Sequence, residues 1–380
     1  MNAWNRNRVT EKLGINYPIV QGPLGGLSSQ KLTAAVSNFG GLGSFGALNL
    51  SPEEIKNVIS QVRSLTSKPF AVNLWVSMED DEARTSDEAA FNRSLRPLAI
   101  YFEQLNAPRP DYKPYSPIKF EDQVRVLLDE NVTVFSFIFG IPPKEILDEC
   151  RAKGIVTIGT ATIPDEAVAL QNAGVDVIVG SGFEAGGHRG SFLRAAEDSV
   201  TGTLSLIPRI VDVVDVPVIA AGGIADARGV IAAFALGAEA VQMGTAFLTC
   251  EESGASRIHR EALMQRKAEY TGLTKAFTGR LARGINNRLM SELNQKGAEI
   301  LPYPLQRILV RNLSIAAEAA GRADLLPLWA GQSANLSSCT DVSVFLNSLV
   351  EEVSEIAGPL TEWDAKRRHK QSKRALRDRK

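Results

Sequence analysis

Eight short runs of apolar residues recur along the first two thirds of the chain, and each run ends in small residues. The runs are apolar at almost every position rather than at every second one, which is typical of parallel strands buried on both faces. We interpret them as the strands of one parallel sheet. They lie at residues 17–24, 41–48, 70–76, 132–140, 155–161, 175–182, 216–223 and 240–248.

Helical patterns lie between these runs. The segment 51–65 begins with Ser51, Pro52 and Glu54, a capping box that has proline at the first helical position. Later segments stop, as helices commonly do, at Gly154, Gly174 and Gly237. Strand and helix in regular alternation predict an α/β fold, the (β/α)8 TIM barrel, which usually takes ~250 residues.

Two regions interrupt the alternation. Residues 77–120 are polar and proline-rich, and loops of that length are commonly functional lids or mobile segments. Residues 251–338 show helical and loop patterns without a strand pattern, so we expect a helical insertion that lines a substrate cavity. We assign 1–250 plus 339–365 to the barrel and expect the basic tail 366–380 to be disordered.

Composition excludes several classes of partner. The net charge of the 380 residues is -1, so no overall field attracts nucleic acid or a membrane surface. No apolar run approaches the ~20 residues that cross a bilayer, and the N-terminus lacks a secretory signal pattern. The cysteines are far apart, at Cys150, Cys250 and Cys339, which favours neither disulfides nor zinc. We expect a cytoplasmic protein.

Glycine-rich segments follow four of the predicted strands: "QGPLGG", "GSGFEAGGH", "AAGGIAD" and "QMGTAF". Barrels of this class carry their active sites at this end of the strands and often bind phosphate after the last two. The backbone N–H groups of Gly222 and Gly223 can face phosphate oxygens, and Gly244 and Thr245 can add further donors. We therefore expect a phosphate-bearing cofactor, although such glycines also serve plain tight turns.

The segment "GLGSFG" at 41–46 matches the GxGxxG pattern of dinucleotide-binding sites. That pattern has meaning where it follows a strand and opens a helix. Here it follows a helical pattern and itself resembles a strand. We interpret it as glycine-rich packing and not as a site for NAD.

Two polar residues near strand ends are candidates for chemistry. Asn73 lies in an apolar strand, where it is either a satisfied core amide or a group that faces a planar heterocycle. His188 lies among glycines, where it is either a turn residue or the proton-transfer group that imidazole provides near neutral pH. We expect the other histidines, His259 and His369, to be solvated.

Together these segments resemble the nitronate monooxygenases, FMN-dependent TIM-barrel enzymes. The resemblance runs from about residue 15 to about residue 335 and includes "YPIVQGPLGGLSS", "AVNLWV", "GFEAGGHRGSF", "FTGRLARGINNRL", "PYPLQ" and "LWAGQ". The loop "EAGGH" alone is also similar to that of flavin-dependent enoyl-acyl-carrier-protein reductases. The later segments favour nitronate oxidation and resemble the first class of the family.

The resemblance implies roles for individual residues. Those that would contact the flavin ring or bring backbone to it are Gly22, Pro23, Leu24, Asn73, Ser181, Gly186 and Gly187. Those that would hold the phosphate are Gly222, Gly223, Gln242, Met243, Gly244 and Thr245. His188 would be the catalytic residue, and it would meet the substrate together with Tyr303. Met243 and Asn73 also have an ordinary explanation as core residues.

Two positions depart from the family pattern. Ser181 stands where relatives usually carry glutamine, so a flavin contact is lost, weakened or bridged by water. Leu24 replaces a common methionine, a change that nearly conserves volume and should be tolerated. The residues "RILVRNLS" after "PYPLQ" also prevent a full transfer of the family's substrate contacts.

The implied reaction is the oxidation of an alkyl nitronate, such as propionate 3-nitronate, with dioxygen to a carbonyl product and nitrite. His188 would either take the α-proton of a nitroalkane while neutral or pair with the nitronate anion while protonated. An NAD(P)H-dependent flavin reductase of the enoyl or quinone reductase type is the alternative. A third possibility is a silent flavin-binding scaffold. The partners expected are the small substrate and dioxygen, with a possible homodimer.

Overall fold

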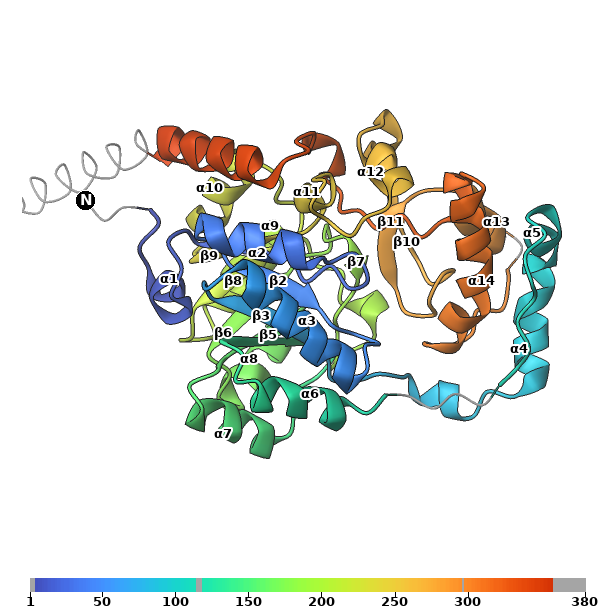
Figure 1. Cartoon of the computed structure of the whole chain (residues 1–380), viewed down its shortest axis with the longest axis horizontal. Helices are drawn as coiled ribbons and strands as arrows, with labels where there is room; N and C mark the ends of the chain where they lie inside the picture. Colours follow the sequence, from blue (N-terminus) through green and yellow to red (C-terminus); the bar gives the residue numbers. More distant parts are fainter. Residues whose placement is uncertain (1–3, 114–117, 296, 358–380) are drawn as a thin grey trace, which may run out of the picture.

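The parallel strands form one barrel. The computed structural model describes residues 4–113, 118–295 and 297–357. The barrel strands are β1 (Ile19–Gln21), β2 (Gly43–Gly46), β3 (Phe70–Trp75), β4 (Val134–Ile138), β5 (Val156–Ala161), β6 (Val177–Ser181), β8 (Val218–Ala221) and β9 (Ala240–Met243). Their order, β1-β9-β8-β6-β5-β4-β3-β2, confirms the TIM barrel (Figure 1). The last strand is shorter than predicted because residues 245–248 form the helix α11 (Thr245–Leu248).

The two edge strands of this sheet, β1 and β2, meet through a short contact that closes the barrel. Val20 pairs with Leu42 in a parallel bridge, and the N–H of Gln21 donates to the Leu42 carbonyl at 2.9 Å. The buried side chain of Gln21 donates to the Ser44 carbonyl at 2.7 Å and accepts from the Ser44 N–H at 3.1 Å. These side-chain hydrogen bonds therefore replace part of the backbone hydrogen bonding that a full pairing of β1 with β2 would provide.

Helices surround the barrel as the alternation predicts. They are α2 (Gln30–Phe39), α3 (Pro52–Leu65), α6 (Phe120–Asp129), α7 (Lys144–Ala152), α8 (Pro164–Asn172), α9 (Thr203–Val211), α10 (Ala227–Ala235) and residues 342–357. The capping box at Ser51 and Glu54 is present. Gly154, Gly174 and Gly237 have φ angles of 70°, 83° and 97°, which confirms their role as helix stops. A further helix, α1 (Arg8–Leu13), packs Val9 and Leu13 against the barrel interior.

The region 251–338 contains two strands, so the expectation that it holds only helices and loops is wrong. β10 (Thr271–Thr274) and β11 (Ala282–Ile285) form an antiparallel pair, and β11 also pairs with β7 (Gly187–His188). The helices here are α12 (Arg257–Leu263), α13 (Arg288–Gln295) and α14 (Leu305–Ala319). The strands escaped prediction because they are short, contain glycine and pair with a distant segment.

The excursion after β3 packs beside this insertion (Figure 1). Its helical elements are η1 (Asp81–Arg84), α4 (Glu88–Leu95), η2 (Arg96–Leu98) and α5 (Ala99–Gln104). Phe91 and Tyr101 share one apolar cluster with Leu309 and Leu313 of α14. Residues 81–104 are therefore a segment of short helices packed against α14, and not a loose loop. We propose to count them with residues 251–338 as one second lobe, while the other domain boundaries stay as predicted.

Three sequence-based expectations concern termini, membranes and cysteines. The tail 366–380 and the segment 358–365 lie outside the described residues. Within the described residues, no helix has both the length and the apolar character needed to cross a bilayer. Cys150, Cys250 and Cys339 are free thiols.

The "GLGSFG" segment is strand β2 with its approach, as predicted, and its glycines allow close packing. An ideal Cβ on Gly43 would overlap the backbone carbonyl of Thr33 in α2. One on Gly46 would lie 2.5 Å from the Pro23 carbonyl oxygen. The motif therefore joins β2 to α2 and to the loop after β1.

We predict that Gly43→Ala destabilises the protein by about 3 kcal/mol or more, because the methyl group would push β2 away from α2. Gly154→Ala is the control, since its Cβ meets open space and only the left-handed backbone costs about 1 kcal/mol. Urea unfolding of both variants measures the difference. Equal losses in the two variants would contradict the packing explanation.

Candidate active site

The loop between β6 and β7 is held by two buried arginines. Arg189 donates to the carbonyls of Gly182 at 2.6 Å, Ser181 at 3.0 Å and Ser199 at 2.9 Å. Burial lowers the pKa of Arg189 to about 10, so the side chain remains charged at neutral pH. The three carbonyl dipoles compensate that charge and fix the end of β6.

Arg283 of β11 holds the same loop from the second lobe. Its guanidinium lies 4.3 Å from the ring centroid of Phe183, and its Nε donates to the Phe183 carbonyl at 3.1 Å. Glu184, the next residue, accepts hydrogen bonds from the N–H and hydroxyl of Thr203 at the start of α9. Glu184 is therefore a helix cap and not a candidate catalyst.

His188 lies on β7, between the barrel and the second lobe. It pairs with Ala282 of β11, and its Nε2 is 2.9 Å from the hydroxyl oxygen of Thr278. Aromatic rings surround the imidazole at centroid distances of 5.0 Å for Trp75, 5.4 Å for Trp329 and 6.4 Å for Tyr303. The structure thus brings Tyr303 next to His188, as the resemblance implied.

Arg280 lies against two aromatic rings near His188. Its guanidinium carbon lies 4.6 Å from the ring centroid of Tyr303 and 4.4 Å from that of Phe139. Its Nε donates to Asp80 at 2.7 Å, and both terminal nitrogens donate to Ser77. Arg280 is therefore immobilised by the segment after β3. It also lines, with Phe139, a neighbouring cleft of about 360 Å³.

The electrostatics of the site favour a neutral imidazole. Burial and the positive charges of Arg280 and Arg307 lower the pKa of His188 to about 3. His188 is therefore neutral near pH 7 and does not carry the positive charge that would pair with an anion. Burial likewise raises the pKa of Tyr303, which stays a neutral phenol. Arg280, which is paired with Asp80, and Arg307 place positive charge near the imidazole.

The predicted phosphate cradle lies where β8 and β9 end. Gly222 and Gly223 have φ angles of 107° and 72°, and an ideal Cβ on Gly222 would lie 3.0 Å from the Gly182 carbonyl oxygen. Gly244 precedes α11, whose first residue, Thr245, accepts a hydrogen bond from the Gly331 N–H at 2.9 Å. The Thr245 hydroxyl hydrogen thus remains available for an oxygen of a ligand.

The residues predicted at the flavin ring lie where β1, β3 and β6 end. The N–H of Gly22 donates to the Met243 carbonyl at 2.8 Å, and Leu24 has a left-handed φ of 45°. The buried Asn73 amide donates to the Ser136 hydroxyl at 3.0 Å. Ser181 ends β6, and its carbonyl is bound by Arg189. These contacts position each residue, and the direct flavin contacts stay predictions.

Two residues assigned to the cofactor site, Met243 and Gly186, also have structural explanations. The Met243 side chain is fully buried in the core, so any part of Met243 in holding the phosphate would fall to its backbone, and that role stays a prediction. An ideal Cβ on Gly186 would lie 2.6 Å from the Gly331 nitrogen, so this glycine serves the contact with the second lobe. Gly187 has a φ of 74° and open space around it, and Gln242 is half-buried.

Sequence reasoning missed Trp75, Thr278, Arg280, Arg307 and Trp329. The two tryptophans lie within segments that carried the resemblance, but only the fold shows that both face His188. His259 is also corrected, because it is buried and its Nε2 lies 2.9 Å from the Trp329 carbonyl oxygen. His369 lies outside the described residues.

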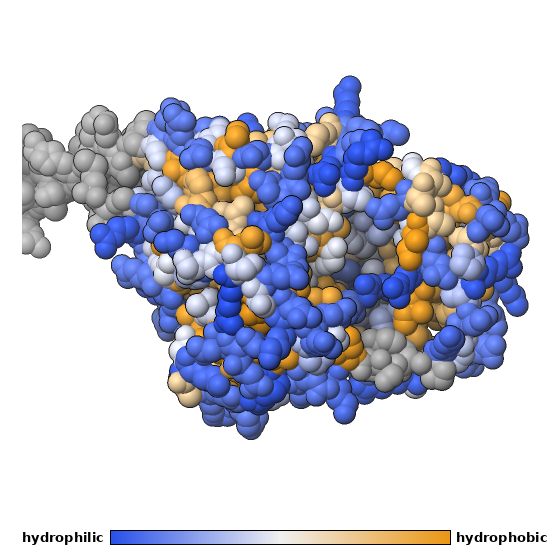
Figure 2. All heavy atoms as spheres, viewed as in Figure 1, coloured by the Kyte–Doolittle hydropathy of each residue, from blue (hydrophilic) through white to orange (hydrophobic). Residues whose placement is uncertain are grey.

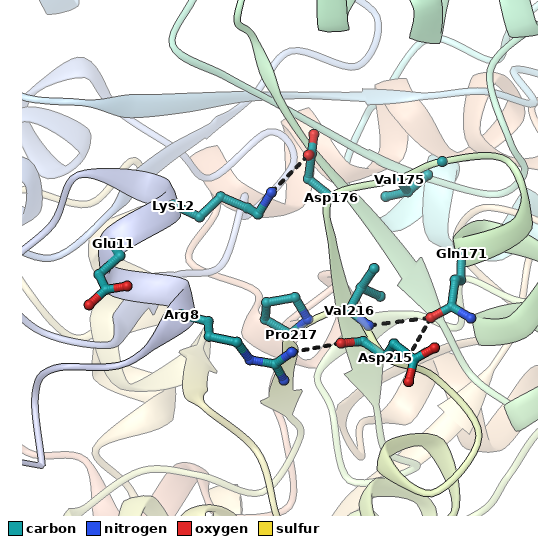
Figure 3. A pocket seen from close by; sticks show the side chains of 10 residues that line it. Arg8, Glu11, Lys12, Gln171, Val175, Asp176, Asp215, Val216 and Pro217 are labelled. Atoms are coloured by element: carbon teal, nitrogen blue, oxygen red, sulfur yellow. Dashed lines mark hydrogen bonds and ion pairs between the residues drawn. The ribbon is translucent and has the colours of Figure 1, made fainter.

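A hollow at the opposite end of the barrel lies at the contact between α1 and the barrel, and its polar groups have a structural role. It lies between α1 and the loops that precede β6 and β8 (Figure 3). Lys12 pairs with Asp176 at 3.0 Å, and Arg8 donates to the Asp215 carbonyl at 2.7 Å. These pairs attach α1 to the barrel, far from the ends of strands that carry His188 and the glycines.

Similarity to known proteins agrees with this geometry. The family model described as nitronate monooxygenase matches residues 6–352. A probable nitronate monooxygenase of Staphylococcus aureus strain Newman is 42% identical over 354 residues, with 93% of this chain and 99% of that protein covered. The chain belongs to the nitronate monooxygenase family.

Solved structures support the same assignment. The nitroalkane oxidase of Streptomyces ansochromogenes superposes with a TM-score of 0.84 at 35% identity, covering 93% of this chain and all of that one. FabK from Thermotoga maritima gives a TM-score of 0.73 at 29% identity, covering 94% and 99%. The chain is thus a TIM-barrel oxidoreductase of a flavin-dependent family.

The low pKa of His188 predicts a pH dependence of stability. The unfolded chain protonates this histidine near pH 6.5, whereas the folded protein does so near pH 3. Between these two pH values the unfolded state binds more protons than the folded state. The free energy of unfolding therefore falls as the pH is lowered, by about 1.4 kcal/mol per pH unit. Urea unfolding at several pH values between about pH 7.5 and about pH 5 gives the free energy of unfolding as a function of pH. This free energy should depend less steeply on pH in His188→Asn than in the wild type. Identical slopes would contradict the assigned burial.

Proposed function

We propose that this protein oxidises alkyl nitronates with FMN and dioxygen, giving a carbonyl product and nitrite. The observation that carries the proposal is a neutral histidine next to two arginines on the rim where the glycine-bearing strands end. A nitronate is a small planar anion whose charge suits guanidinium groups. The membership of the family supports the reaction class, and propionate 3-nitronate is the specific substrate that we expect.

FMN fits the residues that are present. Among the described residues, no protein atom accepts a hydrogen bond from the N–H groups of Gly223 or Gly244, and both lie where β8 and β9 end. Such donors are suited to a phosphate. Glycine at position 187 leaves room for a ring, since a Cβ there would meet open space, whereas a Cβ on Gly22 would crowd Gly244, so Gly22 lets the loops after β1 and β9 approach closely. We infer that Asn73 and the loop of Gly22, Pro23 and Leu24 approach the flavin.

The protein's own groups would bind and orient the substrate. FMN, when bound, supplies the redox chemistry by accepting electrons from the substrate and passing them to dioxygen. Arg307 on α14 is exposed, interacts with the Tyr303 side chain and lies close enough to His188 for its charge to act on the imidazole, so it is placed to meet an anionic group. The rings of Trp75, Trp329 and Tyr303 surround the imidazole and would line the apolar side of the substrate site. His188 would take the α-proton where a neutral nitroalkane binds.

The similarity to FabK favours one second candidate, an NAD(P)H-dependent flavin reductase. The two functions differ in the electron donor. Arginines at the site suit either a nitronate or the phosphates of a nicotinamide nucleotide, so charge alone does not separate them. The identity to the nitronate monooxygenase of Staphylococcus aureus, 42%, makes nitronate the first choice.

The deciding experiment is anaerobic mixing of the purified flavoprotein with propionate 3-nitronate, beside a sample mixed with NADH. We expect the flavin absorbance to bleach with the nitronate alone, and nitrite to appear once air is admitted. His188→Asn should lower turnover of a neutral nitroalkane by about 10² to 10⁴, the usual contribution of a general base. Bleaching by NADH alone would favour the reductase, bleaching by neither donor would favour a silent scaffold, and unchanged turnover in the variant would exclude His188 as the base.

We also predict that Arg307→Gln raises the KM for a nitronate by about tenfold, because a charge-assisted contact is lost while the reacting groups stay in place. Arg311→Gln is the matched control, an exposed arginine one turn further along the same helix α14. Steady-state kinetics at low and high salt measure the effect, which salt should reduce. A similar KM for both variants would exclude Arg307 from the substrate site.

A further inference from the structure

The hydroxyl of Thr278 lies between His188 and a backbone carbonyl. Thr278 is buried in the loop that joins β10 to β11, with 7% of its surface exposed. Its oxygen is 2.9 Å from His188 Nε2 and 3.2 Å from the carbonyl oxygen of Arg280. A hydroxyl has a single hydrogen, so it can donate to only one of these two neighbours.

The chemistry of the two neighbours decides the direction. A carbonyl oxygen only accepts, whereas an imidazole nitrogen either donates or accepts according to the tautomer. If Thr278 donates to the Arg280 carbonyl, the His188 Nε2–H can donate to Thr278, and both contacts are satisfied. The opposite direction leaves this carbonyl without a donor among the described residues, which costs free energy at a buried site.

We propose that Thr278 fixes the neutral tautomer of His188 that carries its proton on Nε2, and so makes Nδ1 the nitrogen that receives the substrate proton. The second half of this statement rests on the proposed function, whereas the tautomer does not. Thr278 is a positioning residue, because it acts through His188. Within the described residues, no protein atom forms a hydrogen bond with His188 Nδ1.

Both partners of this contact are held rigidly. The pairing of β7 with β11 and the bond from the Arg189 N–H to the Leu281 carbonyl, at 2.9 Å, fix the backbone of His188. Gly279 follows Thr278 with a φ of 93°, and an ideal Cβ there would lie 2.6 Å from the Tyr303 nitrogen. Asp80 and Ser77 hold the side chain of Arg280. The hydroxyl therefore has little freedom to move away from the imidazole.

The assignment makes the proton transfer specific. The C–H bond next to the nitro group breaks, its electron pair stays with the substrate as the nitronate, and the proton binds Nδ1. The resulting imidazolium keeps its Nε2–H donated to Thr278. A substrate supplied as the nitronate needs no such step. Loss of the hydroxyl should therefore affect nitroalkanes more than nitronates.

The direct test is ¹⁵N NMR of the flavin-loaded protein labelled at histidine, where the chain has only three histidines to assign. His188→Asn identifies the signals of His188. We expect the wild type to show a proton on Nε2 and a bare Nδ1. Thr278→Val should shift the population toward the other tautomer, Thr278→Ser should restore it, and Thr274→Val should leave it unchanged. Thr274 is a matched control because its buried hydroxyl, on the same hairpin, accepts from the Ala276 N–H at 3.0 Å.

A proton on Nδ1 in the wild type would overturn the proposal, and so would a tautomer that Thr278→Val does not change. The kinetic arm compares nitroalkane with nitronate. We expect Thr278→Val to lower kcat/KM for the nitroalkane by about 10- to 100-fold, below the ~10⁴ known for a catalytic histidine in the wrong tautomer. The value for the nitronate should change less than about threefold, and equal losses on both would overturn the proposal. If neither substrate reacts, the proposed function fails while the NMR result still decides the tautomer.

Discussion

The antiparallel pairing of β7 with β11 joins the barrel to the second lobe, and the geometry of the site depends on it. Through this pairing His188, which follows a barrel strand, acquires Thr278 and Arg280 as neighbours from a hairpin far along the chain. The surface is hollowed where the two parts meet (Figure 2). A backbone ladder is a suitable connection because it fixes position and direction at once, whereas packed side chains alone allow small shifts.

Buried charge is the second constraint. Arg189 and Arg283 hold the loop before β7, yet Arg189 Nε and Arg283 Nη2 are buried without a hydrogen-bond partner in the described structure. Such groups are costly unless most of their donors are satisfied. The carbonyls of residues 181–183, together with Ser199 and Thr271, satisfy other donors of these arginines, and this requirement constrains the course of the loop. The same reasoning explains why His188, near two further arginines, remains neutral.

Local patterns predicted the barrel well because strands that are apolar at almost every position alternate regularly with helical segments along the chain. The interpretation of "GLGSFG" as glycine-rich packing was also correct, since Gly43 packs closely against α2. The strands β10 and β11 could not be predicted in this way, because four-residue segments such as "TGLT" and "ARGI" carry no clear period. His259 was misplaced for a related reason: only the fold brings the Trp329 carbonyl to it.

The sequence by itself determined the barrel and the glycine-bearing ends of its strands, because local periodicity and composition encode both, and its resemblance to a known family implied His188 as the candidate base. Only the tertiary structure decided what surrounds that base. The wall of Trp75, Trp329 and Tyr303, the charges of Arg280 and Arg307 and the hydroxyl of Thr278 come from segments far apart in sequence. The pKa and the tautomer of an imidazole depend on such through-space neighbours, so they follow from the fold and not from any single stretch of residues.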